Sequence, residues 1–439
     1  MLNRFLFKKI DNSSLIIFRV FFGILIGFEC FGAIATGWVR RTLIAPQFTF
    51  SFIGFEWLQP LPGPGMYLYF FIMGILGICI ALGYKYRWSI ISFTLLWAGV
   101  YLMQKTSYNN HYYLLVLISF IMIFLPANRG SSLDVKQNPS LKTNAMPQYV
   151  KWIVVGQLLI VYTFASLAKL YEDWLDNSFI EILMRSRADY FLIGEFLQQT
   201  FVHKAIGWFG IIFDLLIIPA LLWKPSRKIA FALAIFFHLF NSVVLQIGIF
   251  PYLALAFTVF FFEPQTIRKL FFKGRDLYTG AEIEVPTYRN PLLLGLGLYF
   301  LIQLALPVRH HFIEDDVLWT EEGHRMSWRM MLRSRSGSTS FRIVHPQKGT
   351  SEIVKLQDYL TKKQQRKVAC YPDFIWQFAQ HIKKEYAKKG EDIEVYVRSR
   401  VSINGKPYKT FIDPKTDLTK VSWNHLAHHE WILPSEKRK

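Results

Sequence analysis

The segment Val150–Tyr171 reads VKWIVVGQLLIVYTFASLAKLY, and nearly every residue in it is apolar. Between Trp152 and Leu170 the only charge belongs to Lys169, which lies one turn from the end of the segment. A helix needs about 20 apolar residues to cross the ~30 Å hydrocarbon core of a bilayer, so the segment predicts a transmembrane helix. Its lysine is either an anchor at the membrane surface or a group with a chemical role.

Similar apolar stretches follow one another up to about residue 308. The 439 residues are 52% hydrophobic and 17% aromatic, which is the composition of a membrane protein. The candidate spans are residues 14–36, 66–84, 88–104, 110–126, 149–170, 205–223, 227–247, 250–263 and 291–308. The sequence therefore predicts a polytopic all-α transmembrane bundle of about nine helices over residues 1–308.

The basic charge of the chain is explained by membrane topology. The formal net charge is +19, but most Lys and Arg residues fall into short loops and into the C-terminal region. With the N-terminus in the cytoplasm, alternate loops carry most of these charges, as the positive-inside rule requires, and the expected partner is membrane lipid rather than nucleic acid. Nine spans then place the C-terminal region outside. The first apolar run is too long for a signal-peptide core, so we expect it to be retained as a span.

Residues 309–439 predict a small extracytoplasmic α+β domain. Pro372–Lys389 carries apolar residues along one helical stripe, and Gly390 follows as a stop signal. Residues 393–403 alternate apolar and polar side chains as a strand does, and Asn404-Gly405 is a strong hairpin signal.

Cysteine and histidine spacing gives little indication of a metal site. Cys30 and Cys79 lie in apolar runs and Cys370 is isolated in the C-terminal region, so they form no disulfide framework and no ligand pattern. His425 and His429 are four residues apart, but the zinc interpretation is weak without a third ligand. We expect no metal.

Polar side chains inside the apolar runs are the candidate site residues, because such groups are costly in hydrocarbon and usually face a protein interior. They are Arg19, Glu29, Asn109, Asn110, His111, Lys169, Asp214, His238 and Asn241. On the predicted topology, residues 109–111 and Lys169 lie at the outer leaflet. We therefore expect them to share one pocket.

Lys169 has two interpretations. Burial in an apolar pocket disfavours the ammonium form, so the side chain would act as a general base. Alternatively, the lysine extends to the outer interface and pairs with Glu172 or Asp173.

The other buried polar residues also have structural interpretations. We expect Arg19 and Asp214 to be a buried structural pair with partners that the sequence does not identify. His238 and Asn241, three residues apart on one helical face, fit a helix-packing hydrogen bond and a site role equally well.

Four sequence motifs occur in an order that is typical of one known family. They are KTSYNNHYYL at Lys105–Leu114, FASLAKLYEDW at Phe164–Trp174, FFHLFNS at Phe236–Ser242 and WTEEGHRMSWRMMLRSRSG at Trp319–Gly337. With these motifs the chain resembles the vitamin K-dependent γ-glutamyl carboxylase family. The similarity continues to the C-terminal SINGKPYKTFIDP and VSWNHL segments and covers nearly the whole chain.

The resemblance implies a membrane enzyme that oxygenates vitamin K hydroquinone with O2 to the epoxide and carboxylates protein-bound glutamate with CO2. In the family, a lysine at the position of Lys169 deprotonates the hydroquinone, and an alkoxide formed later removes the glutamate γ-proton. Lys169 and His111 are the expected catalytic residues. The expected quinone-binding residues are Asn109, Asn110, His111, His238 and Asn241.

The expected glutamate-binding residues follow the last span, where the C-terminal domain would meet the membrane. They are His310, Trp319, Ser327, Trp328, Arg329 and Arg335. Arg329, Arg333 and Arg335 would bind carboxylates through bidentate hydrogen bonds, but a basic run at a membrane surface also fits contact with lipid headgroups.

Two departures from animal members affect these expectations. Ala168 stands where those members have the first of two adjacent lysines, and His324 replaces a tyrosine of the substrate segment. Both departures are compatible with the hydroquinone chemistry, but they affect the expectation that the substrate is a peptide. The alternatives are a quinone epoxidase that carboxylates no peptide and a non-enzymatic transporter or lipid-binding module. We expect a bacterial plasma-membrane protein whose partners are lipid, a Glu-containing protein or peptide, and a quinone-epoxide reductase.

Overall fold

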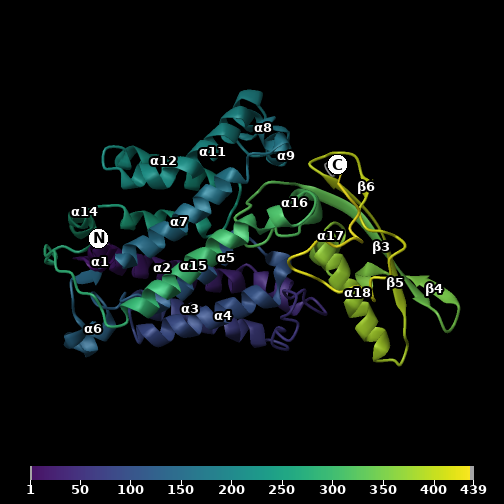
Figure 1. Cartoon of the computed structure of the whole chain (residues 1–439), viewed down its shortest axis with the longest axis horizontal. Helices are drawn as coiled ribbons and strands as arrows, with labels where there is room; N and C mark the ends of the chain where they lie inside the picture. The colour runs from purple at the N-terminus through teal and green to yellow at the C-terminus, as the bar shows by residue number, and fades with distance from the viewer. Residues whose placement is uncertain (1, 436–439) are drawn as a thin grey trace.

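The structure is a computed structural model that describes residues 2–435. Long apolar helices form a bundle, and strands β3 to β6 form a sheet at one end of it (Figure 1). The helices of the bundle are α2 (Ser13–Ala35), α3 (Gly65–Leu82), α4 (Tyr86–Met103), α5 (Asn110–Phe124), α7 (Tyr149–Leu167), α11 (Thr200–Leu222), α12 (Arg227–Val243), α13 (Phe250–Phe257) and α15 (Arg289–Val308). Every stretch that the sequence predicts as a span therefore contains a helix.

Some of these helices are long and apolar enough to cross a membrane. Within the described chain there are five such helices: α2, α3, α7, α11 and α15, the last counted as far as Phe312. Helix α5 and the segment Phe250–Phe260 are apolar but shorter. The membrane character is thereby confirmed, and the number of nine spans stays a prediction.

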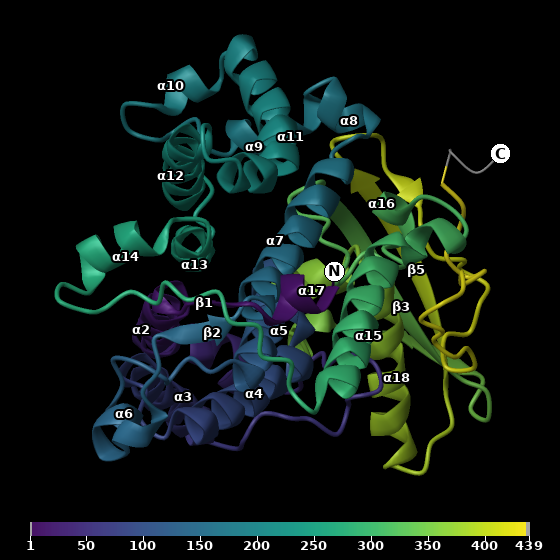
Figure 2. The same ribbon diagram turned by 60° about the vertical axis from the view of Figure 1, so that its left-hand side comes forward.

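Short elements connect the long helices. They are α1 (Leu2–Phe7), β1 (Lys9–Asp11), α6 (Leu133–Gln137), β2 (Ala145–Pro147), α8 (Glu172–Leu175), α9 (Ser178–Arg185), α10 (Gly194–Leu197), α14 (Pro264–Phe271) and α16 (Val317–Thr320). β1 and β2 pair as a two-stranded antiparallel sheet. Helices α8, α9 and α10 link α7 to α11 and lie with α11 and α12 on one side of the molecule (Figure 2).

Helices α2 and α3 approach each other closely because glycines face each other across their interface. A Cβ atom on Gly23 would lie 2.3 Å from the amide nitrogen of Ala81. One on Gly77 would lie 2.8 Å from the amide nitrogen of Gly27. Small residues of this kind allow the tight helix packing that is common in membrane proteins.

Arg19 on α2 is fully buried and binds main-chain carbonyls. Its guanidinium donates to the carbonyl oxygens of Ala81, Ala127, Gly130 and Ser131. These carbonyls are the partners of Arg19 that the sequence did not identify, and they give Arg19 a structural role. Backbone acceptors of the α3 end and of the loop after α5 take the place of a carboxylate.

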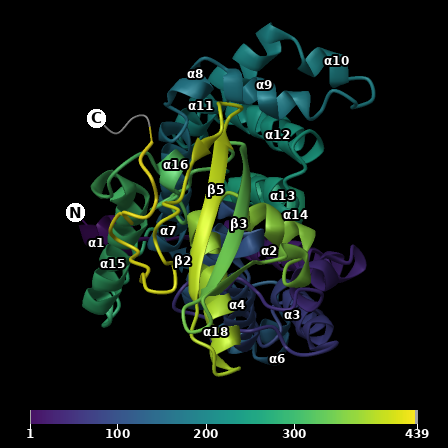
Figure 3. The same ribbon diagram turned by 90° about the vertical axis from the view of Figure 1, so that its right-hand side faces the viewer.

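The C-terminal region is the predicted α+β domain. Its antiparallel sheet has the order β4-β3-β5-β6, with β3 (Arg335–His345), β4 (Thr350–Ile353), β5 (Glu394–Ile403) and β6 (Lys409–Thr410). Helix α18 (Pro372–Ala387) lies beside this sheet (Figure 3), and α17 (Lys362–Val368) contacts β3. On the buried side, the ring of Phe341 on β3 meets that of Phe378 on α18 at 4.9 Å.

The predicted helix, strand and hairpin of this domain are confirmed. Helix α18 begins at the predicted Pro372. Asn404 and Gly405 follow β5 with φ of 52° and 74°, and the chain returns to pair with it as β6. Asn and Gly are favoured at such left-handed turn positions because their steric cost there is low.

A buried ion cluster joins the bundle to the C-terminal domain. Asp373 on α18 lies 2.6 Å from the Lys105 ammonium and 2.8 Å from the Arg325 guanidinium. Burial lowers the pKa of Lys105 to about 8, against the opposing effect of Asp373. Burial alone would raise the pKa of Asp373, but Arg325 and Lys105 hold it well below its usual range. The carboxylate therefore stays charged and fixes the domain on the bundle.

Candidate functional site

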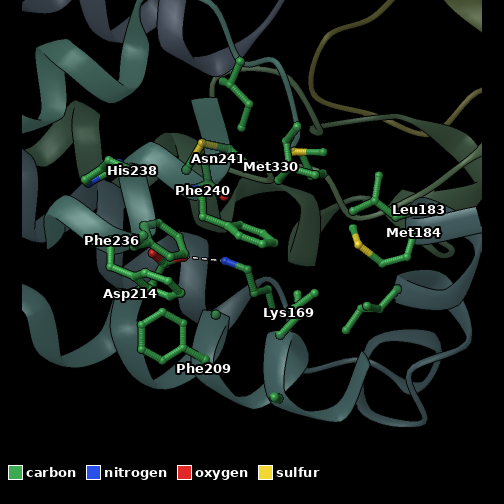
Figure 4. A pocket seen from close by; sticks show the side chains of 18 of the residues that line it. Lys169, Leu183, Met184, Phe209, Asp214, Phe236, His238, Phe240, Asn241 and Met330 are labelled. Carbon is green, nitrogen blue, oxygen red and sulfur yellow. Dashed lines mark hydrogen bonds and ion pairs between the residues drawn. The ribbon is translucent and has the colours of Figure 1, made fainter. Parts of the chain in front are cut away.

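A cavity of about 330 Å³, called the apolar cavity below, lies among α5, α7, α9, α11 and α12 (Figure 4). Its volume falls within the range of about 300–1,000 Å³ that is typical of small-molecule sites. Aromatic side chains provide much of its wall: Tyr162, Trp174, Phe196, Phe201, Phe209, Phe236, Phe237, Phe240 and Phe250. This lining suits a large apolar or aromatic ligand.

Lys169 projects into the apolar cavity from the end of α7. Its side chain is buried, and its Nζ forms an ion pair with Asp214 of α11. Nζ also donates to the Ala165 carbonyl at 3.1 Å and lies 5.4 Å from the centre of the Trp174 ring. Figure 4 shows the lysine and the aspartate pointing toward each other.

This position excludes the alternative in which Lys169 extends to the interface and pairs with a neighbour in sequence. Asp173, four residues further on, instead accepts hydrogen bonds from Asn404 at 2.7 Å and from Lys406 at 2.6 Å. Asp173 therefore holds the β5–β6 turn. The carboxylate partner of Lys169 is Asp214, for which the sequence had identified no partner.

Three further predicted residues line the apolar cavity: His111, His238 and Asn241. His238 is buried, and its Nε2 hydrogen-bonds to the Tyr162 hydroxyl at 3.0 Å. Within the described chain its Nδ1 has no hydrogen-bond partner. The His111 ring stacks on Phe250 with 3.9 Å between ring centres. The cavity thus brings the predicted catalytic lysine together with two imidazoles and an amide.

Asn109 and Asn110 are placed differently. Asn109 caps α5 by accepting a hydrogen bond from the Tyr112 amide at 2.7 Å. Asn110 accepts from the Tyr108 hydroxyl at 2.9 Å and donates to the Arg329 carbonyl at 3.0 Å. Both border a second cavity rather than the apolar one. Their contacts position the start of α5, and with it His111.

The second cavity, called the charged cavity below, has a volume of about 190 Å³. It shares His111, Met330 and Met331 with the apolar cavity. Its lysine, arginine, histidine and glutamate lining residues are Lys105, His111, Glu321, His324, Arg325, Arg329, Arg333 and Lys367. Cations outnumber carboxylates in this lining, so the cavity suits an anionic group.

A third cavity of about 510 Å³, called the junction cavity below, lies between the ends of α7 and α15. His310, Ser327 and Arg329 of the predicted glutamate-binding set line it. Arg329 borders the junction cavity and the charged cavity at once. Burial, aided by Arg333, lowers the pKa of Arg329 to about 10, so its cation would gain from an anionic partner.

The rest of the predicted glutamate-binding set makes contacts within the protein. Trp319 packs on Phe411 and donates to the Leu433 carbonyl at 2.7 Å. Trp328 is buried with its ring 5.0 Å from that of Tyr113. None of the three cavities includes these tryptophans among its lining residues.

Arg329, Arg333 and Arg335, the three arginines of the basic run, differ in how far they are taken up by contacts within the protein. Arg335 donates to the carbonyls of Leu318, Trp319 and Cys370. Arg333 and Arg335 both form ion pairs with Glu321. Of the three, Arg329 is the one whose lining position spans two cavities.

The segment that separates the cavities has an unusual backbone. Met326, Trp328 and Met331 have φ of 59°, 57° and 49°. Non-glycine residues rarely adopt this left-handed conformation, and where they do they cluster at functional sites. The strained segment holds Met330 and Met331 between the apolar and charged cavities.

Sequence reasoning missed Tyr162 in the apolar cavity and did not identify the partner of Asp214. Tyr162 precedes Lys169 by seven residues, which is two helical turns, so the spacing could have placed both on one face of α7. Asp214 was recognised as a costly buried charge, but its partner was not identified. Its 45-residue separation from Lys169 leaves no local pattern for the pairing.

The C-terminal histidines make a different contact from the one considered for them. His429 and His428 both place Nδ1 against the Glu322 carboxylate, at 2.6 Å and 2.7 Å. Among residues 2–435 no group of three or more His, Cys, Asp or Glu side chains is arranged to hold a metal ion.

The fold and cavities define a polytopic membrane protein with a lysine-containing apolar cavity next to an α+β domain. A model of the HTTM domain matches residues 7–265. A model described as Vitamin K-dependent gamma-carboxylase, lumenal domain, matches residues 288–438. The chain therefore belongs to the vitamin K-dependent gamma-carboxylase family, and the predicted family is confirmed. The lumenal-domain match indicates that the C-terminal domain is extracytoplasmic. No solved structure matches the chain.

Proposed function

We propose that this protein is a γ-glutamyl carboxylase that oxygenates vitamin K hydroquinone in the apolar cavity and carboxylates glutamate where that cavity meets the charged cavity. The observation that carries this proposal is the position of Lys169. It is a buried amine in an aromatic cavity that also contains His111 and His238. The family relationship supports the choice of substrates.

The apolar cavity fits a naphthohydroquinone ring. Its aromatic walls suit the ring faces, and His238 offers Nδ1, a buried nitrogen with no hydrogen-bond partner in residues 2–435. Asn241, one helical turn further along α12, adds an amide at the same wall. We expect His238, Asn241 and His111 to orient the ring oxygens, because fixed hydrogen-bond donors stabilise negative charge that develops on oxygen.

Lys169 is the proposed base. A neutral amine at Nζ accepts a proton from the substrate hydroxyl, and the apolar wall excludes water that would compete for it. When bound, reduced vitamin K supplies the reducing power and, through its oxygenation to the epoxide, the strong base that allows CO2 to add at the glutamate γ-carbon. The chain's own contribution is to hold the ring, receive the proton and keep the cavity dry.

Arg329 is the proposed anchor for the glutamate carboxylate. It borders the charged and junction cavities and lies 3.4 Å from His310 Nε2. An arginine fork binds carboxylates strongly. A glutamate held there would lie on the other side of Met330 and Met331 from the apolar cavity. Two cavities with a shared wall would thus keep the two substrates apart yet adjacent.

The test is a double assay with purified protein in nanodiscs. It measures vitamin K epoxide and labelled bicarbonate fixed into a Glu-containing peptide in the same sample. We expect both products with the intact chain and neither with Lys169→Ala. Epoxide without fixed label would instead favour a quinone epoxidase, and no epoxide would contradict the proposal.

We also propose the setting of this activity. The N-terminus lies in the cytoplasm of a bacterial cell, and the C-terminal domain receives the protein substrate outside the plasma membrane. A quinone-epoxide reductase regenerates the substrate. Accessibility of single cysteines introduced at the two ends of the bundle to an impermeant reagent tests the orientation.

A further inference from the structure

Asp214 is buried in the middle of α11 with an aromatic surrounding. Phe209 and Phe236 lie beside it in the same cavity wall (Figure 4). Asp214 is 5% exposed, and its carboxylate forms an ion pair with Lys169, which is 7% exposed. Because an unpaired charge in such a place is strongly unfavourable, the ion pair stabilises the two groups together.

This pairing matters for the proposed function, on which the inference rests. A lysine ammonium has no lone pair and cannot accept a proton from a hydroxyl. A carboxylate next to the amine favours that ammonium form. Lys169 therefore becomes a base only when the proton between it and Asp214 moves.

We propose that Lys169 and Asp214 act as one proton-holding unit, in which Asp214 is the positioning residue that controls when Lys169 is free to accept a proton. The proton shifts from Nζ to Oδ2 and leaves a neutral amine beside a neutral carboxylic acid. The substrate hydroxyl then transfers its proton to Nζ. The result is an ammonium, a carboxylic acid and a substrate anion, so atoms and charge balance.

The remaining titratable groups around the pair are accounted for. In residues 2–435 those that line the apolar cavity are Tyr162 on α7, His238 on α12 and His111 on α5. Tyr162 and His238 hydrogen-bond to each other, and His111 stacks on Phe250. None of the three carries a permanent negative charge that would substitute for Asp214.

The geometry also allows the lysine to keep its place when the carboxylate is removed. Nζ retains the Ala165 carbonyl as acceptor and the Trp174 ring as a neighbour. Asp214→Asn preserves the shape of the side chain and removes only the negative charge. The variant therefore isolates the effect of that charge on the lysine.

The first measurement does not depend on turnover. The full-length protein in nanodiscs is treated with formaldehyde and a borane reductant over a pH series, and methylation of Lys169 is quantified by peptide mass spectrometry. Only the neutral amine reacts. We expect Asp214→Asn to shift the midpoint of labelling at least about one pH unit lower, because removal of the carboxylate favours the neutral amine. Asp214→Glu should keep the midpoint near that of the intact chain.

Asp173→Asn is the matched control. It removes a second buried aspartate that is also paired with a lysine, four residues from Lys169 but outside the apolar cavity. We expect no shift of the Lys169 midpoint. If Asp214→Asn destabilises the protein, its labelling midpoint is measured on the folded fraction after size exclusion, and Asp214→Glu and Asp173→Asn are treated in the same way.

The second measurement is the pH profile of epoxide formation. We expect the acid limb of Asp214→Asn to move in the same direction as the labelling midpoint, with a lower maximal rate because the amine is a weaker base. Coincident labelling midpoints for the intact chain and Asp214→Asn would overturn the inference. A shifted midpoint with no epoxide from the intact chain would instead contradict the proposed function and leave the proton-holding unit established.

Discussion

The apolar cavity and the charged cavity share a wall, but their linings differ in the balance of cationic and anionic side chains. The apolar cavity contains one cation and one carboxylate, Lys169 and Asp214, bound to each other. The charged cavity brings five lysine and arginine side chains to its lining against one glutamate. A balanced pair suits a place where a proton moves, and an excess of cations suits a place where an anion binds. The difference suggests a division of work between the two cavities.

The largest expected effect comes from the apolar cavity. Lys169→Ala removes the proposed base, so epoxide formation should fall by about 10²–10⁴-fold, the usual range for a general base. Binding of a Glu-containing peptide should be unchanged, because the charged cavity is untouched. Fluorescence anisotropy of a labelled peptide checks the second expectation. Loss of peptide binding together with epoxide would break the division between the cavities.

The second effect concerns the ion cluster that supports the charged cavity. Asp373→Ala leaves Lys105 and Arg325 buried without their carboxylate, which should cost about 3–5 kcal/mol of stability. Thermal unfolding in nanodiscs measures it. Asp392→Ala, in the loop before β5, is the control and should behave as the intact chain. Equal melting of the two variants would mean that the cluster does not hold the domain in place.

The same cluster predicts a pH dependence. The pKa of Asp373 is held below its unfolded value, so its contribution to stability is complete above an unfolded pKa of about 3.9. This contribution is lost as the pH falls further toward the pKa that Asp373 has in the folded protein. We therefore expect contact between α18 and the bundle to persist at about pH 5 and to weaken below about pH 4. Hydrogen exchange of α18 amides follows this directly.

A smaller effect should follow from Arg329→Gln. Loss of a charged hydrogen bond of about 1.5–3 kcal/mol should weaken peptide binding by about 10–100-fold. The quinone concentration that gives half-maximal rate should stay the same. Arg342→Gln, on the exposed side of β3, is the control. An equal weakening by both variants would indicate a general effect of surface charge.

The smallest predicted effect is that of Tyr162→Phe. It removes the hydrogen bond to His238 Nε2, worth about 1 kcal/mol, and should raise the KM for hydroquinone by roughly fivefold. Tyr113→Phe loses a comparable bond to Gln303 outside the apolar cavity and should leave that KM unchanged. A similar rise of this KM in both variants would contradict the role of His238 in orienting the quinone ring.

Local patterns predicted much of this molecule. The apolar run before Lys169 predicted α7, and the Asn404-Gly405 pair predicted the end of β5, because both signals are complete within a few residues. The pairing of Lys169 with Asp214 and the carbonyl contacts of Arg19 were not predictable in this way. They depend on which helices pack together, and no short-range pattern encodes that choice.

The predicted glutamate-binding residues also show that a local sequence pattern does not determine tertiary contacts. The run from Trp319 to Arg335 predicted carboxylate-binding arginines in general. The backbone directs Arg335 into the C-terminal domain and leaves Arg329 between two cavities. Met326 and Met331, on either side of Arg329, adopt left-handed conformations, and neither residue type signals such a conformation in sequence.

Locating the bound quinone is the measurement that tests the role of the apolar cavity most directly. Cryo-electron microscopy of the intact protein in nanodiscs with vitamin K quinone and a Glu-containing peptide would locate both. We predict the quinone ring in the apolar cavity between Lys169 and His238, and the peptide carboxylate at Arg329. Quinone bound elsewhere on the bundle, with lipid filling the apolar cavity, would contradict the assignment of that cavity as the site of hydroquinone chemistry.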